Sequence, residues 1–180
     1  MNDDRYSRRT RFAPIGQAGQ EKIAQSNVVI VGCGALGSIA AEMLCRAGVA
    51  SLRLIDRDFV EWSNLQRQSL YTAADAEKSI PKVIAAEKHL LALNISVEVD
   101  ARIADLHVGT VEDLLAGADL IIDACDNFIT RHLINEFACK HQIPWIYAAC
   151  VGSYACGMTI IPGETACLAC IQDQLPSAGD

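Results

Sequence analysis

The sequence predicts an α/β fold in which a doubly wound, mostly parallel sheet carries helices on both faces. Short β-branched apolar runs alternate with longer helical patterns along the chain. A glycine-rich turn joins the first of these runs to the helix that follows it. The 180 residues, 51% of them hydrophobic, suffice for one well-buried domain and are too few for two domains of ordinary size.

The first half of the chain supplies two strands on either side of a helix. In order, we expect a short helix, a buried strand, a glycine-rich turn, a helix, a second strand and a long loop (17–25, 28–31, 32–37, 38–47, 52–56 and 59–76). Gly48 ends the second helix. The loop has no clear hydrophobic period, and long loops inside compact domains are usually functional.

The second half repeats the alternation of helix and strand. Pro81 suits the first turn of a helix over 82–93. The later elements are a strand, a helix, a strand, a helix and two final strands (97–99, 110–116, 120–124, 127–141, 144–149 and 154–161). In the helix over 127–141 the apolar positions fall on one stripe, formed by Ile129, Leu133, Ile134 and Phe137.

Charge and composition narrow the class of partner and compartment. The formal net charge of −7 argues against nucleic acid as a partner. Residues 1–10 lack the apolar core of a signal peptide. The apolar stretch 28–50 contains Glu42 and Arg46, so it fits a strand and helix better than a membrane span. We therefore expect a cytoplasmic protein whose eight cysteines stay reduced, most of them buried as small hydrophobic residues.

The glycine-rich turn predicts a phosphate-binding loop. Residues 32–37 read Gly-Cys-Gly-Ala-Leu-Gly, which fits G-x-G-x-x-G between a strand and a helix, as in a Rossmann-like fold. Asp56 ends the next strand, at the spacing of an acid that accepts the ribose hydroxyls of a nucleotide. A glycine-rich turn without a ligand is the simpler alternative. The motif itself leaves NAD, FAD, S-adenosylmethionine and ATP open.

The long loop after Asp56 favours a nucleoside triphosphate. Asp58 is followed by the run Ser63-Asn64-Leu65-Gln66-Arg67-Gln68, at the carboxyl edge of the sheet where such folds bind ligands. A dinucleotide oxidoreductase has no need of this cluster, whereas Arg67 suits phosphate oxygens because a guanidinium binds them in a bidentate manner. Taken alone, the run is equally consistent with a solvated surface loop.

Seven motifs in sequence order carry a resemblance to a known family. They are Arg5-Tyr6-Ser7-Arg8, Gly32-x-Gly34-x-x-Gly37, Asp56-x-Asp58, the run 63–68, Pro81-Lys82, Asp123-x-x-Asp126-Asn127 and Cys167-x-x-Cys170. Together they span nearly the whole chain. In these motifs the chain resembles the N-terminal part of ThiF/MoeB/HesA proteins, the bacterial adenylyltransferase relatives of ubiquitin-activating enzymes.

The resemblance implies ATP-dependent adenylation of the C-terminal glycine carboxylate of a ubiquitin-like sulfur-carrier protein that ends in Gly-Gly. The carrier would belong to thiamine or molybdopterin biosynthesis, and pyrophosphate would leave. By the same resemblance Asp56 holds the ribose, Asn64 and Arg67 contact the triphosphate, and Lys82 neutralises phosphate charge. The full set implied to bind MgATP is Gly32, Gly34, Ala35, Gly37, Asp56, Asp58, Asn64, Gln66, Arg67, Lys82, Asp126 and Asn127.

Catalysis, by the same resemblance, rests on Arg8, Arg67, Lys82 and Asp126. Asp126 binds Mg²⁺, a hard cation that combines carboxylate and phosphate oxygens. Arg8 reaches the ATP of the neighbouring subunit in a homodimer. The family usually has Gln at the position of Arg9, which leaves open whether Arg8 or Arg9 makes that contact. Ala35 stands where the family has a third motif glycine, and it is small enough for close approach.

The Cys167/Cys170 pair resembles half of the family's four-cysteine structural zinc site. The second pair is absent from these 180 residues, so we expect the N-terminal portion of a longer protein. The expected organisation is an N-terminal arm and helix (1–26), an ATP-binding domain (27–163) and the start of a zinc-binding crossover segment (164–180).

Two other classes of function stay open. One is a related adenylating enzyme that acts on a peptide or a tRNA base; the cysteine pair counts against the tRNA branch. The other is an NAD-dependent oxidoreductase or a catalytically silent nucleotide-binding partner. The presence of Arg67, Lys82 and Asp126 together argues against the oxidoreductase and against the silent partner, because a silent partner could lose these residues freely.

Overall fold

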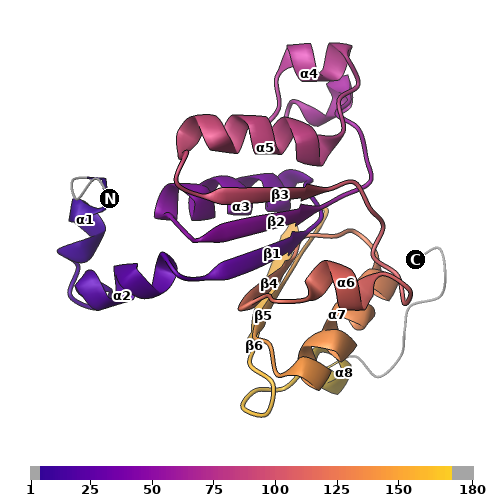
Figure 1. Ribbon diagram of the computed structural model, residues 1–180. Helices are drawn as coiled ribbons and strands as arrows, with labels where there is room; N and C mark the ends of the chain where they lie inside the picture. The colour runs from indigo at the N-terminus through magenta and orange to yellow at the C-terminus, as the bar shows by residue number, and fades with distance from the viewer. Residues whose placement is uncertain (1–4, 172–180) are drawn as a thin grey trace.

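The computed structural model describes residues 5–171, and within them six strands form one sheet (Figure 1). The strand order is β3-β2-β1-β4-β5-β6. Strands β1 to β5 pair in parallel, and β6 pairs antiparallel with β5. The strands are β1 Asn27–Val31, β2 Ser51–Ile55, β3 Glu98–Arg102, β4 Leu120–Asp123, β5 Trp145–Val151 and β6 Tyr154–Ile160. The doubly wound, mostly parallel sheet predicted from the sequence is confirmed.

Helices cover both faces of this sheet. Figure 1 shows α3 and α5 on one side and α6, α7 and α8 on the other. The helices are α1 Ser7–Thr10, α2 Gly16–Ile23, α3 Ala35–Ala47, α4 Ala73–Glu77, α5 Lys82–Leu93, α6 Val111–Leu115, α7 Phe128–His141 and α8 Leu168–Ile171, with a 3₁₀ turn η1 over Trp62–Asn64. Among the described residues no helix is both long and apolar enough to cross a membrane.

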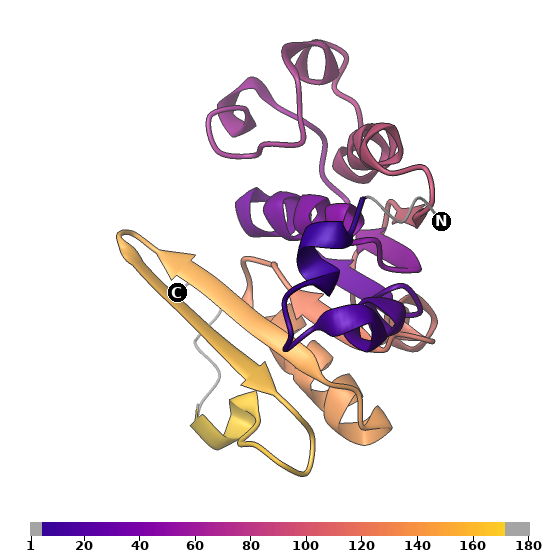
Figure 2. The same cartoon turned by 90° about the vertical axis from the view of Figure 1, so that its left-hand side faces the viewer.

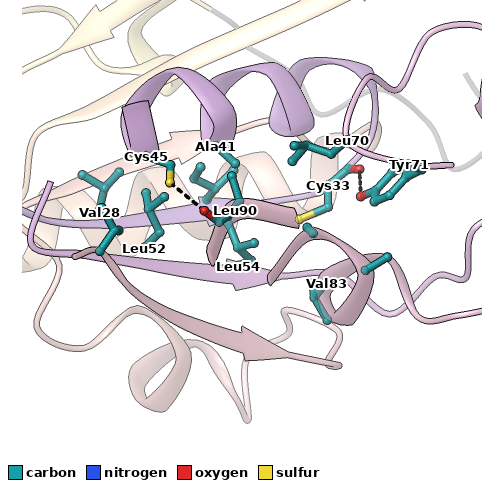
Figure 3. Packing of buried hydrophobic residues seen from close by; sticks show 14 of the residues in the cluster. Val28, Cys33, Ala41, Cys45, Leu52, Leu54, Leu70, Tyr71, Val83 and Leu90 are labelled. Atoms are coloured by element: carbon teal, nitrogen blue, oxygen red, sulfur yellow. Dashed lines mark hydrogen bonds between the residues drawn. The ribbon is translucent and has the colours of Figure 1, made fainter. Parts of the chain in front are cut away.

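The alternating faces of the central strand feed two separate cores. Val28 and Ile30 of β1 pack with the core under α3 and α5, whereas Val29 and Val31 pack with the core under α6 and α7. Successive side chains of a strand point to opposite faces, so a strand covered on both sides reads as a continuous apolar run. Figure 3 shows part of the first core, in which Leu54 lies with residues of α3 and α5.

Several elements differ from the sequence prediction. Helix α3 begins at Ala35 rather than 38, because Gly34 is its N-cap. The expected loop 59–76 contains η1 and the first residues of α4, which begins with a capping box between Thr72 and Asp75. Helices α1 and α8 were not expected. Ile129, predicted on the buried stripe of α7, has 73% of its surface exposed.

The β5–β6 hairpin extends beyond the helical layers (Figure 2). Its outer residues, 150–157, are exposed. The cysteines were expected to be mostly buried, but all eight are free and only Cys33 and Cys45 are buried. Cys150 and Cys156 lie in this exposed part of the hairpin, Cys170 is also exposed, and Cys125, Cys139 and Cys167 are partly buried.

Candidate functional site

Two glycines make the turn between β1 and α3 possible. Gly32 has φ +94°, and a Cβ there would meet the carbonyl oxygen of Ala124 at 2.5 Å. A Cβ on Gly37 would collide with the backbone of Gly32. The first turn of α3 therefore packs directly against the turn that precedes it, and its free N–H groups face the carboxyl edge of the sheet. Such a helix start attracts anions.

Asp56 lies beside this turn, as its position after β2 predicts. Its Oδ2 accepts the backbone N–H of Cys33 at 2.7 Å, and its Oδ1 accepts the N–H of Asp58 at 2.8 Å. An ionised carboxylate has about four acceptor positions, so both oxygens can accept further hydrogen bonds from ribose hydroxyls. The carboxylate thus fixes the glycine turn and is available to a ligand.

Lys82 is brought to the same edge by its place at the start of α5. Its Nζ lies 2.9 Å from Oδ2 of Asp58, and its backbone N–H donates to the Asp58 carbonyl at 2.8 Å. Although Lys82 is buried, Asp58 is exposed. The ammonium group is therefore held at the carboxyl edge with a counterion on its solvent side.

The polar run after β2 divides into inward and outward side chains. Asn64 is buried, and its Oδ1 accepts the backbone N–H of Glu61 at 3.1 Å, so its side chain shapes η1. Gln66 and Arg67 are exposed. Arg67 donates one hydrogen bond, to the carbonyl of Ser63 at 2.8 Å. Since a guanidinium carries five N–H donors, the remaining ones can serve a phosphate.

Gln68 belongs to the run 63–68, but neither its residue type nor its spacing predicted a role for it. It is 3% exposed, and its Nε2 lies 3.9 Å from where a Cβ on Gly34 would be. Its Oε1 is buried and has no hydrogen-bond partner among residues 5–171. The Gln68 amide therefore lies within van der Waals reach of the glycine turn.

The segment after β4 completes the edge. Asn127 is the N-cap of α7, and its Oδ1 accepts the N–H of Thr130 at 2.8 Å. Asp126 is exposed, and no described residue donates a hydrogen bond to its side chain. An open carboxylate next to a phosphate-binding turn fits the ligand set of Mg²⁺, which combines one or two carboxylates with phosphate oxygens.

A buried ion pair supports this segment. Arg131 Nε lies 3.3 Å from Oδ2 of Asp123, and Arg131 Nη2 donates to the carbonyl of Cys125 at 2.7 Å. The guanidinium also stacks against the rings of Phe128 and Tyr147. Burial and the neighbouring Asp123 raise the pKa of the Cys125 thiol well above its ordinary value, so this thiol stays protonated and a poor nucleophile.

The N-terminal arm lies at the opposite edge of the sheet. Arg9 Nη1 donates to the carbonyl of Ala47 at 2.7 Å and to Gln20 Oε1 at 3.2 Å. Arg8 is exposed, and no hydrogen bond joins its side chain to another described residue. Ala47 ends the 13-residue helix α3, whose length of ~20 Å separates the arm from the glycine turn (Figure 1).

The cysteine pair lies on and beside α8, next to α7. Cys167 Sγ and Cys170 Sγ are 3.5 Å apart, and the N–H of Leu168 donates to Oδ1 of Asn135 at 2.9 Å. Burial raises the pKa of the nearby Cys139 thiol, and Cys167 adds to this shift. Within residues 5–171 no group of three or more His, Cys, Asp or Glu side chains could hold a metal ion. The pair has the form of an open half site, and the rest of the expected segment 164–180 lies outside the described residues.

The structure thus brings most of the predicted residues to one edge and leaves three apart. Most of them follow the carboxyl end of a strand: the glycine turn follows β1, the segment with Asp126 and Asn127 follows β4, and β2 is followed by Asp56, Asp58 and the loop containing Asn64, Gln66 and Arg67. Lys82 lies at the start of α5. Arg8, Cys167 and Cys170 lie elsewhere.

The profile of the ThiF family matches residues 6–179 of this chain. The sulfur carrier protein ThiS adenylyltransferase of Bacillus subtilis is 50% identical over 175 residues, which are 97% of this chain and 52% of that protein. The protein of the same name from Escherichia coli is 38% identical over 175 residues, 95% of this chain and 69% of that protein. The chain therefore spans about half to two thirds of the length of these curated relatives.

A solved structure has the same fold. The crystal structure of E. coli MccB with ATP superimposes with a TM-score of 0.85 at 28% sequence identity. The match covers 94% of this chain and 52% of that one.

Proposed function

Because this chain belongs to the ThiF family, we propose that it is the nucleotide-binding part of an adenylyltransferase. The enzyme would use MgATP to adenylate the C-terminal glycine carboxylate of a ubiquitin-like sulfur-carrier protein ending in Gly-Gly. The observation that carries the proposal is the meeting of the glycine turn, the paired Lys82 and the Arg67 loop at one edge of the sheet. Two relatives that are named as ThiS adenylyltransferases support the substrate class.

The proposed reaction is an in-line displacement at the α-phosphorus of ATP. A carboxylate oxygen of the carrier's terminal glycine forms a bond to that phosphorus, the bond to the bridging oxygen breaks, and pyrophosphate leaves with its electron pair. The protein needs no covalent nucleophile, because orientation and charge stabilisation lower the barrier. Lys82, Arg67 and the start of α3 supply positive charge near the phosphates. Mg²⁺, held by Asp126, would neutralise further phosphate charge when bound.

The arm supports a two-fold homodimer in which Arg8 acts on the neighbouring subunit. Arg9 is engaged by Ala47 and Gln20 of its own chain, whereas Arg8 is exposed. The ~20 Å length of the 13-residue helix α3 keeps Arg8 from the glycine turn of its own subunit. Of the two arginines, Arg8 is therefore the one we assign to the ATP of the partner.

Two further assignments belong to the same proposal. Cys167 and Cys170 would form half of a structural zinc site, with two more cysteines from a longer parent protein. The enzyme would work in the cytoplasm, where thiols stay reduced, and the eight free cysteines agree with that compartment. Thiamine and molybdopterin carriers are both compatible with the site.

The test is ATP–pyrophosphate exchange by the intact protein with candidate carriers. We expect exchange that requires the carrier's C-terminal glycine, together with binding of ATP in preference to NADH. A carrier lacking its last glycine is the matched control. Tight NADH binding with negligible ATP binding, or exchange that ignores the terminal glycine, would overturn the proposal.

A further inference from the structure

We propose that Tyr71 is a positioning residue for the nucleotide, because its hydroxyl fixes the direction of the Gly34 N–H in the glycine turn. This inference rests on the proposed function, since it names a further residue that prepares the same site for phosphate. Tyr71 follows the Arg67 loop and precedes α4, a region in which the family motifs assign no role to it.

The contact is a buried hydrogen bond. Tyr71 Oη donates to the carbonyl oxygen of Cys33 at 2.7 Å, and Tyr71 is 7% exposed (Figure 3). Burial raises the pKa of the Tyr71 hydroxyl far above its ordinary value, with a smaller contribution from Cys33. The hydroxyl therefore stays protonated and remains a donor throughout the working pH range.

Through the geometry of the peptide group, this hydrogen bond sets the direction of the Gly34 N–H. The carbonyl of Cys33 and the N–H of Gly34 belong to the same planar, trans peptide, so they point in opposite directions. A donor that holds the carbonyl oxygen inside the protein therefore aims the Gly34 N–H away from the core. No described residue accepts a hydrogen bond from that N–H, which leaves it available to an anion.

The peptide on the other side of Cys33 is held as well. Asp56 accepts the Cys33 N–H at 2.7 Å, so Asp56 and Tyr71 fix the two peptides that flank this residue. Glycine has the widest backbone freedom, and Gly34 could otherwise rotate its peptide at little cost. The clamp supplies the rigidity that the motif glycines lack.

The same hydroxyl joins the two phosphate-facing segments. The backbone N–H of Tyr71 bonds to the carbonyl of Gln68 at 3.4 Å, and the N–H of Gln68 bonds to the carbonyl of Asn64 at 3.0 Å. Tyr71 is thus continuous with the loop that carries Arg67 and is bonded to the glycine turn. A shift of one segment is transmitted to the other.

The test compares Tyr71→Phe with Cys45→Ala in the intact protein. Cys45 Sγ donates to the carbonyl of Leu90 at 3.3 Å in the same core but at the far end of α3, so Cys45→Ala removes a buried bond away from the site (Figure 3). MgATP affinity is titrated well below the unfolding temperature, and exchange is measured at saturating ATP. Tyr71→Phe should weaken ATP binding about 5- to 30-fold and change the saturated exchange rate little. Cys45→Ala should bind ATP as the wild type does.

Wild-type affinity in Tyr71→Phe, or equal weakening in Cys45→Ala, would overturn the inference. Failure of the wild type to bind ATP is a different result, because it would contradict the proposed function as well as this inference. If Tyr71→Phe does not fold, amide exchange in the wild type decides. MgATP should slow exchange of the Gly34 N–H and leave the Ala50 N–H, bonded to Ser26 at the opposite edge, unchanged. No slowing at Gly34 overturns the assignment.

Discussion

The ammonium group of Lys82 is paired with the carboxylate of Asp58 at 2.9 Å, and a backbone bond joins the same two residues. The side chain of Lys82 is 9% exposed and that of Asp58 is 58% exposed. A phosphate that approaches from solvent therefore meets this pair from the side of Asp58. The pair orients the Lys82 side chain before the nucleotide arrives, and we expect ATP then to compete with Asp58 for the ammonium group.

Replacement of Lys82 should slow the proposed reaction strongly. We expect Lys82→Ala, and likewise Arg67→Ala, to lower ATP–pyrophosphate exchange about 10²- to 10³-fold, because each removes a group that stabilises developing phosphate charge. Lys78→Ala is the matched control, since Lys78 is an exposed lysine four residues before Lys82 in the sequence. Unchanged exchange in Lys82→Ala and Arg67→Ala would remove both residues from the mechanism.

The sequence was sufficient to predict the sheet and the edge at which most of the candidate site residues lie. A β-branched run followed by G-x-G-x-x-G, and an acid at the end of the next strand, specify local geometry that depends little on distant residues. Asp56 accordingly lies against the glycine turn. The loop from Asn64 to Arg67 was placed correctly because consecutive parallel strands end at one edge.

Side-chain partners could not be obtained in this way. The Lys82–Asp58 pair, the Tyr71–Cys33 bond and the anchoring of Arg9 at Ala47 all join residues 24 or more positions apart. These contacts form through tertiary packing, which the local hydrophobic periodicity of the sequence does not predict. The short helix α4 is a different case, because the Thr72-x-x-Asp75 capping signal was present but stood outside any hydrophobic pattern.

Asp75 should make the stability of the fold depend on acid pH. Burial would raise the pKa of Asp75, but hydrogen bonds from Thr72 and His89 outweigh it and hold the pKa at about 2. A carboxylate with a lowered pKa stabilises the fold above its unfolded pKa of about 4, and that contribution is lost as pH falls from about 4 to 2.

Asp75→Asn should therefore lower the free energy of unfolding at pH 7 by about 1–2 kcal/mol, the usual cost of losing such a cap. The difference from the wild type should shrink as pH falls from about 4 to 2. Denaturant unfolding over this pH series is the measurement. Asp105→Asn is the control, because Asp105 forms an exposed pair with Arg57 that contributes little. A difference that is the same at every pH would contradict the linkage.

Zinc content tests the open half site. Two thiolates leave two positions of a tetrahedral ion to water, so residues 1–180 alone should hold zinc weakly or substoichiometrically. The longer parent protein should bind about one ion per chain through four cysteines. Elemental analysis measures both, with Cys170→Ser as the disrupting variant and Cys150→Ser, an exposed hairpin cysteine, as the control. One tightly held zinc per 180-residue chain would contradict this and direct attention to Cys139.

Arg8 gives the strictest test of assembly, because the geometry separates it from its own glycine turn by the length of α3. If Arg8 serves the partner's site, a subunit with Arg8→Ala still has a complete Lys82 site, and a subunit with Lys82→Ala still has a complete arm. A dimer of the two therefore contains one site with both residues. Random mixing of equal amounts should restore about one quarter of wild-type exchange, since half the dimers are mixed and each has one working site.

Each variant alone should be nearly inactive, so the restored activity is measured against a low background. Arg11→Ala is the control for disturbance of the arm, because Arg11 is an exposed arginine three residues further along the chain and should leave exchange unchanged. The mixed dimers have to be verified, for example by purification through two different tags. Verified mixed dimers without activity would mean that Arg8 acts within its own subunit or not at all. If Arg8 acts within its own subunit, the arm would have to leave Ala47, where Arg9 anchors it, before Arg8 could reach the nucleotide.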